Sequence, residues 1–293
     1  MARLTLTAFC DLKFCPISFD FVTWLVRAMK ERDKAGCDGL HVVLVPHEEG
    51  LGGFSRVWGE HDEAATRWRL WHILMAAIPL AGTKATVTFA SGRSQCKSLS
   101  SEFVWWPQGK AHFMGPLVES AKRGEKISKL RATDAARRYV SHWGLADKFA
   151  TLTCRNQSTC SDRNSDADAW DRFSKTLKIP FIRLDDTNQA LGKFGGKWSE
   201  LDIDVRLALY EKASMNLIGN NGPSVLLQLS DAPYINFGFG YPENWLSHVE
   251  KYFSLKNDEQ LPWANKNQKL VYGPDTFESL KAEFEKWDTA TAS

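Results

Sequence analysis

Apolar and polar residues alternate along the first half of the chain with two different periods. Leu4, Leu6 and Ala8 are two residues apart, as on a strand, whereas the apolar residues of 22–29 have helical spacing. The run 40–45 is largely apolar, as in a strand buried on both faces of a parallel sheet. The strands expected in this half cover residues 4–8, 40–45, 85–90 and 103–105. Helices are expected at 20–29 and, rich in aromatic residues, at 63–77.

The second half of the chain repeats this alternation of strands and helices. A helix at 133–143 ends at Gly144. Three later helices are expected to begin with a capping-box spacing, at Ser165, Ser199 and Asp275. Further helices are expected at 223–229 and 243–253. The strands of this half are expected at 149–154, 181–184, 215–219, 234–237 and 270–272.

This pattern predicts an α/β protein with two Rossmann-like parallel-sheet domains that face each other across a cleft. The predicted domains are 1–145 and 146–293. Residues 110–131 are rich in Gly, Pro, Lys and Ser and are expected to form a connection at the edge of the cleft. In such sheets the ligand binds beyond the carboxyl ends of the strands.

Composition narrows the classes of protein that fit. The 293 residues are 43% hydrophobic and 25% charged, as in an ordinary globular protein, and the net charge of +2 gives no electrostatic footprint for nucleic acid. The six cysteines lack metal-ligand spacing, so no metal site is predicted. No run approaches the roughly 18 apolar residues of a membrane helix, and the start lacks the regions of a signal peptide. A cytoplasmic protein is therefore expected.

The strand at 215–219 runs into an unusual turn, Asn220-Asn221-Gly222-Pro223-Ser224. Pro223 stands where a helix should begin, and unpaired backbone N–H groups at such a point favour an anion. An ordinary tight turn is the alternative interpretation.

Polar residues also follow the strand at 149–154. Arg155 comes directly after it, and Arg163 and Asn164 lie in the loop beyond. A guanidinium forms two parallel charge-assisted hydrogen bonds with a phosphate. A phosphate or pyrophosphate held between these residues and the turn at 220–224 is therefore predicted, with a salt bridge at the sheet edge as the alternative for Arg155.

Acidic residues at strand ends supply further candidates. Asp185, next to Asp186 after the strand at 181–184, is a candidate for holding a ribose hydroxyl or, alternatively, part of a turn. In the first half, Asp11 and Glu48 are our candidates for a general base, although the pattern does not choose between them and neighbours such as Asp20. The chain contains no Walker A motif, GxGxxG fingerprint or GxSxG elbow.

The second half resembles the donor-binding half of GT-B glycosyltransferases, near the bacterial O-fucosyltransferase-like and polysaccharide-biosynthesis enzymes. The stretches that carry the resemblance are 151–155, 163–165, 206–213 and 218–224. The resemblance implies that Arg155 contacts the pyrophosphate of a nucleotide-sugar donor and that Asn221, Gly222, Pro223 and Ser224 cradle the donor. It also implies that arginines and backbone amides, rather than a metal ion, stabilise the departing diphosphate.

The leading hypothesis is a glycosyltransferase that moves a sugar from a nucleotide-sugar donor to a glycan or lipid-linked acceptor, without a cofactor. Two alternatives stay open: a nucleotide-sugar epimerase or hydrolase on the same scaffold, and a non-catalytic sugar- or nucleotide-binding protein. The expected location is the cytoplasm, with peripheral association at the inner face of the membrane left open. The oligomeric state is also left open.

Overall fold

The structure is a computed structural model that describes residues 4–47, 63–82, 84–157, 160–186 and 202–292. Within these residues the strands form two separate parallel sheets, one in each half of the chain. The predicted fold class, two Rossmann-like parallel-sheet domains, is therefore confirmed.

The first sheet has the strand order β3-β2-β1-β4. Every pairing is parallel, and β2 lies in the middle of the sheet with buried residues along almost its whole length. Burial on both faces is the physical reason that its sequence reads as an uninterrupted apolar run. The strands are β1 (Thr5–Asp11), β2 (Gly39–Val45), β3 (Ala85–Phe89) and β4 (Phe103–Trp105), close to their predicted positions.

The second sheet has the strand order β6-β5-β7-β8-β9, again parallel throughout. Its central strands β5 and β7 are neighbours and buried at every residue. Their carboxyl ends therefore lie next to each other at one edge of the sheet. The strands are β5 (Ala150–Thr153), β6 (Phe181–Arg183), β7 (Met215–Gly219), β8 (Tyr234–Phe239) and β9 (Gln268–Tyr272).

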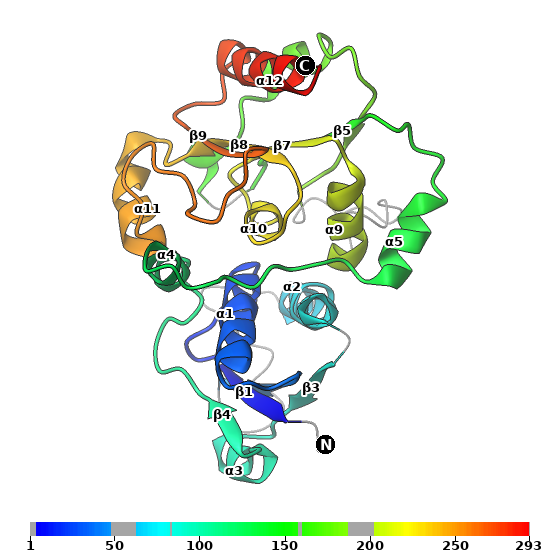
Figure 1. Cartoon of the computed structure of the whole chain (residues 1–293). Coiled ribbons are helices and arrows are strands. Elements are labelled where there is room, and N and C mark those ends of the chain that lie inside the picture. Colours follow the sequence, from blue (N-terminus) through cyan, green and yellow to red (C-terminus); the bar gives the residue numbers. More distant parts are fainter. Residues whose placement is uncertain (1–3, 48–62, 83, 158–159, 187–201, 293) are drawn as a thin grey trace.

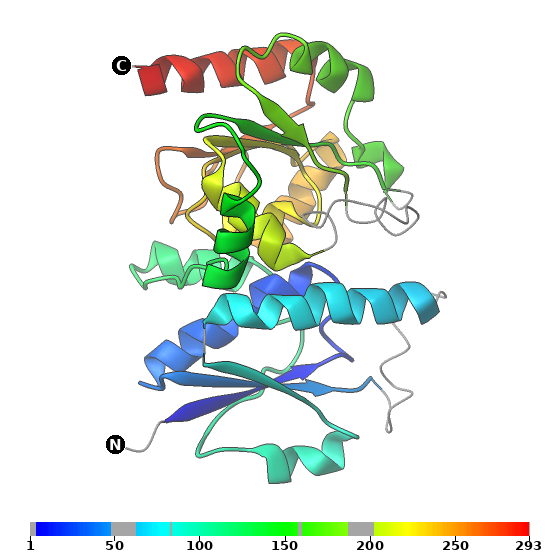
Figure 2. The same cartoon turned by 90° about the vertical axis from the view of Figure 1, so that its right-hand side faces the viewer.

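Helices form layers above, between and below the sheets (Figure 1). The outer face of the second sheet carries α12, the first sheet carries α3 on its far side, and two inner helix layers meet in the middle of the molecule (Figures 1 and 2). The helices of the first half are α1 (Asp20–Lys34), α2 (Glu63–Arg69), α3 (Cys96–Leu99), α4 (Gly115–Lys122) and α5 (Asp134–Ser141). Those of the second half are α6 (Ala167–Ser174), α9 (Ile203–Lys212), α10 (Ser224–Gln228), α11 (Leu246–Phe253) and α12 (Phe277–Ala292).

The two halves are packed against each other through these inner layers. A single hydrophobic cluster extends from Ala8 and Trp24 in the first half to Leu226 in α10. The backbone contributes as well, because Leu130 N–H donates to the Leu229 carbonyl over 2.8 Å. α5 lies on the side of the second half, where Thr133 Oγ1, just before it, donates to Asp204 over 2.6 Å. The domain boundary at residue 145 stays a prediction.

The expected connection at 110–131 contains a helix that the pattern did not predict. α4 has a proline in its first turn, and Leu117 and Val118 are buried. Gly115 allows its close approach to the end of α11, since a Cβ there would lie 2.7 Å from Ser254 Oγ. The segment differs from the prediction because its glycine allows close packing and its proline starts a helix, whereas both residues are also typical of loops.

Two of the expected helix caps are also wrong. The residue that caps α6 is Asp166, whose side chain accepts from Ala169 N–H, while the Ser165 hydroxyl accepts from Arg155 N–H over 2.9 Å. Asp275 accepts a hydrogen bond from the Trp170 indole over 2.6 Å. The side chains of Ser165 and Asp275 thus hydrogen-bond to groups distant in the sequence, although their spacing in the sequence predicted that they cap helices. The third expected cap, Ser199, lies outside the described residues.

The helix expected at 63–77 changes its geometry halfway. After α2 it continues as a π-helix, Leu70–Met75. The wider turn buries Leu70, Ile73 and Leu74 against the first half. π-helical turns are often found at functional sites.

Gly222 lies close to the first half, and this contact yields a prediction on stability. A Cβ at this position would lie 2.6 Å from Cδ2 of Phe19, which belongs to the first half. Gly222→Ala should therefore lower the free energy of unfolding by about 1–3 kcal/mol, the usual cost of overpacking. Chemical denaturation measures the change.

Phe19→Ala provides the matched control for this prediction. In that background the ring is gone, and Gly222→Ala should cost much less, giving a clear coupling energy in a double-mutant cycle. Additive effects of the two substitutions would contradict the assigned contact.

Candidate functional site

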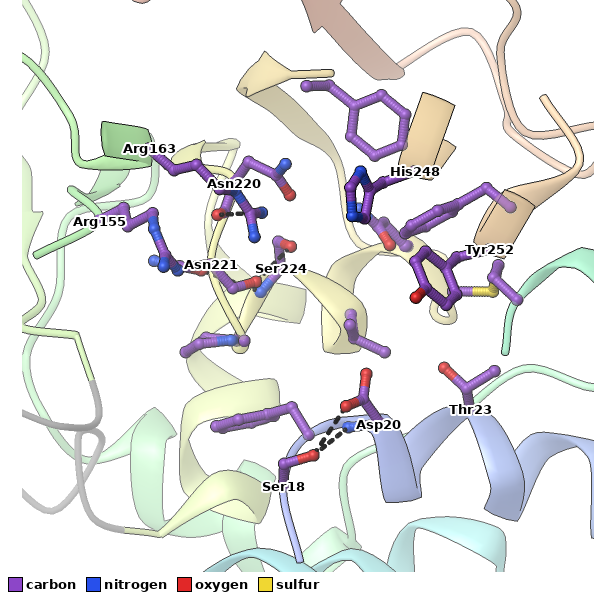
Figure 3. Close-up of a pocket in the computed structure, with 18 of the residues that line it drawn as sticks. Ser18, Asp20, Thr23, Arg155, Arg163, Asn220, Asn221, Ser224, His248 and Tyr252 are labelled. Atoms are coloured by element: carbon purple, nitrogen blue, oxygen red, sulfur yellow. Dashed lines mark hydrogen bonds between the residues drawn. The ribbon is translucent and has the colours of Figure 1, made fainter. Parts of the chain in front are cut away.

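A cavity of about 470 Å³ lies between the two halves, at the carboxyl ends of β5 and β7. Three walls surround it, as Figure 3 shows. One wall carries Arg155, Arg163 and the turn 220–224; the second is the start of α1; the third is α11 with His248 and Tyr252. Its position is the ligand crevice that such sheets are expected to have.

Gly219 lets the ends of β5 and β7 come together. A Cβ at Gly219 would lie 2.6 Å from Ser165 Oγ and 2.9 Å from Arg155 N, so no larger residue fits without displacing the backbone. The loop after β5 is closed on itself, because Arg155 N–H donates to Ser165 Oγ and Ser165 N–H donates to the Arg155 carbonyl. This pair of hydrogen bonds fixes the position of the Arg155 backbone, from which the side chain extends.

Arg163 is held in the cavity by an aromatic ring and a carbonyl. Its guanidinium carbon lies 4.0 Å from the ring centre of Trp245, and Nη2 donates to the Asn220 carbonyl over 3.4 Å. Its Nε has no hydrogen-bond partner among the described residues. Burial, followed by repulsion from the Arg155 charge, lowers the pKa of Arg163 to about 10.

Arg155 is only 8% exposed, and burial lowers its pKa while the nearby Asp186 carboxylate opposes the shift. Asp186 is itself buried and lines the cavity. A bound anion lowers the electrostatic energy of two guanidiniums that repel each other in a poorly solvated site. The electrostatics of this wall therefore favour a phosphate-type ligand.

The backbone of the turn after β7 offers fewer free N–H groups than its sequence suggests. The N–H groups of Asn221, Ser224, Val225 and Leu226 donate to backbone carbonyls within the turn. α10 is also a helix of five residues, shorter than the predicted segment. The N–H of Gly222 is not among these donors, and the backbone cradle for an anion stays a prediction.

Asn221 supplies one such side chain. Its Oδ1 accepts from Ser224 N–H over 3.2 Å, and this contact orients the amide so that Nδ2 is turned the other way. Nδ2 is buried without a hydrogen-bond partner among the described residues. Asn221 lines the cavity, and Nδ2 is the end of its amide that still lacks a hydrogen-bond acceptor among the described residues.

The start of α1 brings a carboxylate to the opposite wall. Asp20 is exposed to the cavity, and its Oδ2 accepts from the Ser18 hydroxyl over 2.9 Å (Figure 3). His112 lines the same cavity; burial lowers its pKa, while the Asp20 charge acts to raise it. An acid and an imidazole thus lie near each other, facing the arginine wall.

The predicted site residues divide into three groups. The cavity brings together those from the two central strands: Arg155, Arg163, Asn220, Asn221, Gly222, Pro223 and Ser224. Asn164 does not line it, because its amide accepts from Gln157 N–H and donates to the Gln157 carbonyl. Asp185 does not line it either, and its neighbour Asp186 does. Asp11 is paired with Arg93 at 2.6 Å, away from the cavity. Glu48 lies outside the described residues.

The cavity also contains residues that the pattern did not single out. Trp245, just before α11, and His248 and Tyr252 on α11 follow one another at helical spacing, and Gln228 and His112 also line the cavity. Spacing of i, i+3 and i+7 is the one signal that could have grouped the three aromatic residues. Nothing in the local sequence distinguishes His112 or Gln228.

Two kinds of feature, a metal-ligand cluster and a membrane-spanning helix, are absent from the described residues. They contain no group of three or more His, Cys, Asp or Glu side chains placed to hold a metal ion. None of their helices is long and apolar enough to cross a membrane.

Comparison with known proteins gives distant likenesses only. No family model matches the chain, and no curated protein matches it. Among solved structures, the chain is similar to the Escherichia coli heptosyltransferase WaaC with ADP, at 13% identity and a TM-score of 0.42, covering 97% of each chain. It is also similar to the Methanocaldococcus jannaschii UDP-GlcNAc 2-epimerase in complex with UDP-GlcNAc and UDP, at 12% identity and a TM-score of 0.37, covering 96% of this chain and 92% of that one. Values of this size support no conclusion about activity.

Pyrophosphate should stabilise the protein against heat, because it relieves the repulsion between Arg155 and Arg163. At a concentration of about 100 times Kd the expected gain is about 2.7 kcal/mol. Arg155→Ala should abolish the gain, whereas Arg172→Ala, which removes an arginine that lies over Phe277 outside the cavity, should retain it. Equal stabilisation of wild type and Arg155→Ala would contradict the assigned anion site.

Trp245→Leu should weaken pyrophosphate binding without removing any charge. The substitution takes away the ring under Arg163, a contact that contributes about 0.5–2 kcal/mol. Isothermal titration should therefore show a loss of about 2- to 30-fold in affinity. Phe277→Leu, which removes the corresponding ring under Arg172, is the control and should leave the affinity unchanged.

Proposed function

We propose that this chain is a glycosyltransferase that moves a sugar from a nucleotide-sugar donor to a glycan or lipid-linked acceptor in the cytoplasm. The observation that carries the proposal is the pair of guanidiniums of the buried Arg155 and the half-buried Arg163, set across one cavity from the Asp20 carboxylate. Leaving-group stabilisation and proton removal are the two tasks of such a transfer, and this cavity has groups suited to each on opposite walls.

The arginine wall suits a departing diphosphate. When the bond between sugar and diphosphate breaks, negative charge builds up on the phosphate oxygens. Arg155, Arg163 and the donor Nδ2 of Asn221 are oriented before that charge develops, which makes them effective in the transition state. Side chains take the role that the resemblance assigned partly to backbone amides.

Asp20 suits the role of general base, in place of the candidates Asp11 and Glu48. It is the carboxylate at the start of α1 in the cavity, and Ser18 holds one of its oxygens by a 2.9 Å hydrogen bond. The other oxygen is available to accept the proton of an acceptor hydroxyl, and general base catalysis of this kind contributes about 10²–10⁴-fold. His112 lies close enough to interact electrostatically with this carboxylate.

The size and lining of the cavity are consistent with a nucleotide sugar. A volume of about 470 Å³ is within the range of about 300–1,000 Å³ for small-molecule sites. The aromatic residues of α11 provide flat surfaces for a base or a sugar ring.

A specific observation also favours the second candidate function, a nucleotide-sugar epimerase or hydrolase. Such an enzyme needs an acid/base pair beside the donor, and Asp20 with His112 provides two titratable groups in one cavity. It differs from a transferase in consuming donor without any acceptor.

The test begins with a thermal-shift panel of UDP, GDP, CMP, ADP and their sugars, with and without magnesium. The nucleotide sugar that stabilises the protein is then used in a turnover assay with glycan and lipid-linked acceptors. Asp20→Asn should bind this donor as wild type does and lose about 100-fold in kcat/KM for transfer. Asp11→Asn, at the carboxylate paired with Arg93 outside the cavity, is the control and should keep its turnover per folded molecule.

The remaining outcomes separate the alternatives. Donor consumption at the same rate without acceptor would favour the epimerase or hydrolase. Donor binding without turnover in wild type would favour a binding protein. If no nucleotide or nucleotide sugar stabilises the wild-type chain, the proposal fails.

A further inference from the structure

Gln228 is a buried amide at the same cavity that the proposed mechanism does not use. It lies at the end of α10, four residues after Ser224, and is 1% exposed. Residues four apart on a helix share a face, so Gln228 and Ser224 both line the cavity. Burying an amide this deeply requires hydrogen-bond partners for both of its ends.

The orientation of this amide is set by a chain of hydrogen bonds that starts in the second sheet. Asn236, on β8, uses Nδ2 to donate to the carbonyls of Ile218 and Phe237. Its Oδ1 is therefore the end that meets Gln228, and it accepts from Gln228 Nε2 over 2.9 Å. A flipped Gln228 would place two acceptor oxygens in contact, so Nε2 faces Asn236 and Oε1 faces away from it.

Gln228 Oε1 is left as an acceptor without a hydrogen-bond partner among the described residues. We propose that Gln228 is a specificity-determining residue, whose Oε1 accepts a hydrogen bond from a hydroxyl or N–H group on the uncharged part of the ligand. The inference rests on the proposed function, since the ligand in question is a nucleotide sugar held at its phosphates by Arg155 and Arg163.

The two amides of this wall have opposite polarity. Asn221 is fixed with its donor, Nδ2, unsatisfied, and Gln228 is fixed with its acceptor, Oε1, unsatisfied. The donor belongs to the turn before α10, and the acceptor belongs to the last residue of α10, seven residues later. A ligand that matches both has an anionic group joined to a part that carries hydrogen-bond donors, as a nucleoside or a sugar does. An inorganic diphosphate matches only the first.

The closing experiment compares Gln228→Met with wild type by isothermal titration, using pyrophosphate and the nucleotide sugars of the thermal-shift panel. Methionine keeps the length of the side chain and removes the acceptor. Affinity for the best nucleotide sugar should fall about 10-fold, because the ligand's buried hydroxyl or N–H group loses Gln228 Oε1 as its acceptor. Affinity for pyrophosphate should be unchanged.

Two variants control for effects on folding. Tyr234→Phe removes another buried hydroxyl that has no partner among the described residues and does not line the cavity, so its affinities should equal those of wild type. If Gln228→Met alone does not fold, the double variant Gln228→Met/Asn236→Leu replaces both partners by apolar groups, which proteins tolerate better. The same 10-fold difference between ligands is expected of it.

The outcomes distinguish this inference from the proposed function. Wild-type affinity of Gln228→Met for every nucleotide sugar, or an equal loss for pyrophosphate, overturns the role of Gln228 while leaving the proposed function standing. Failure of wild type to bind any nucleotide sugar overturns both.

Discussion

The mutual repulsion of Arg155 and Arg163 is the constraint around which the polar residues of this fold are arranged. Burial and the charge of its neighbour lower the pKa of Arg163, so its charged form is maintained against an electrostatic cost. Among the groups that offset part of that cost are the Trp245 ring, the Asn220 carbonyl and the Asp186 carboxylate beside Arg155. They come from three different loops of the second sheet. A folded protein retains such an arrangement when a ligand supplies the missing negative charge, which is the physical argument for an anion site.

Close backbone packing makes this arrangement possible. Gly219 leaves room for Arg155 N and Ser165 Oγ, and Gly222 leaves room for the Phe19 ring of the first half. The first glycine joins the ends of β5 and β7 into one wall, and the second brings the start of α1 to the opposite side. The hydrophobic cluster that spans both halves then holds Asp20 facing the arginines. The geometry of the cavity is therefore a property of the interface between the halves as much as of either sheet.

The sequence predicted the sheets well because buried parallel strands are nearly uniform in apolar character. It also predicted that Arg155, Arg163 and the turn after β7 would meet, since β5 and β7 are neighbours in the sheet. It failed where partners distant in the chain decide a residue's contacts. Asp11 directly ends a strand, where a catalytic carboxylate is expected, yet it pairs with Arg93. Among the described acidic residues of the first half, Asp20 at the start of α1 is the one that lines the cavity. Similarly, the N–H groups of Asn221 and Ser224 donate to carbonyls within the turn, which local sequence did not indicate.

Buried amides are where local sequence is least informative and the fold most so. An asparagine or glutamine can present either a donor or an acceptor, and only its fixed contacts decide which. At Asn221 the contact is the Ser224 N–H, which leaves a donor for the cavity; at Gln228 it is Asn236, which leaves an acceptor. Two backbone carbonyls of the sheet orient Asn236 in turn. The orientation of the Gln228 amide therefore depends on the backbone, and neither amide can flip without losing a hydrogen bond. Recognition that depends on such a chain discriminates strongly, since a ligand without the matching group leaves a buried oxygen unsatisfied.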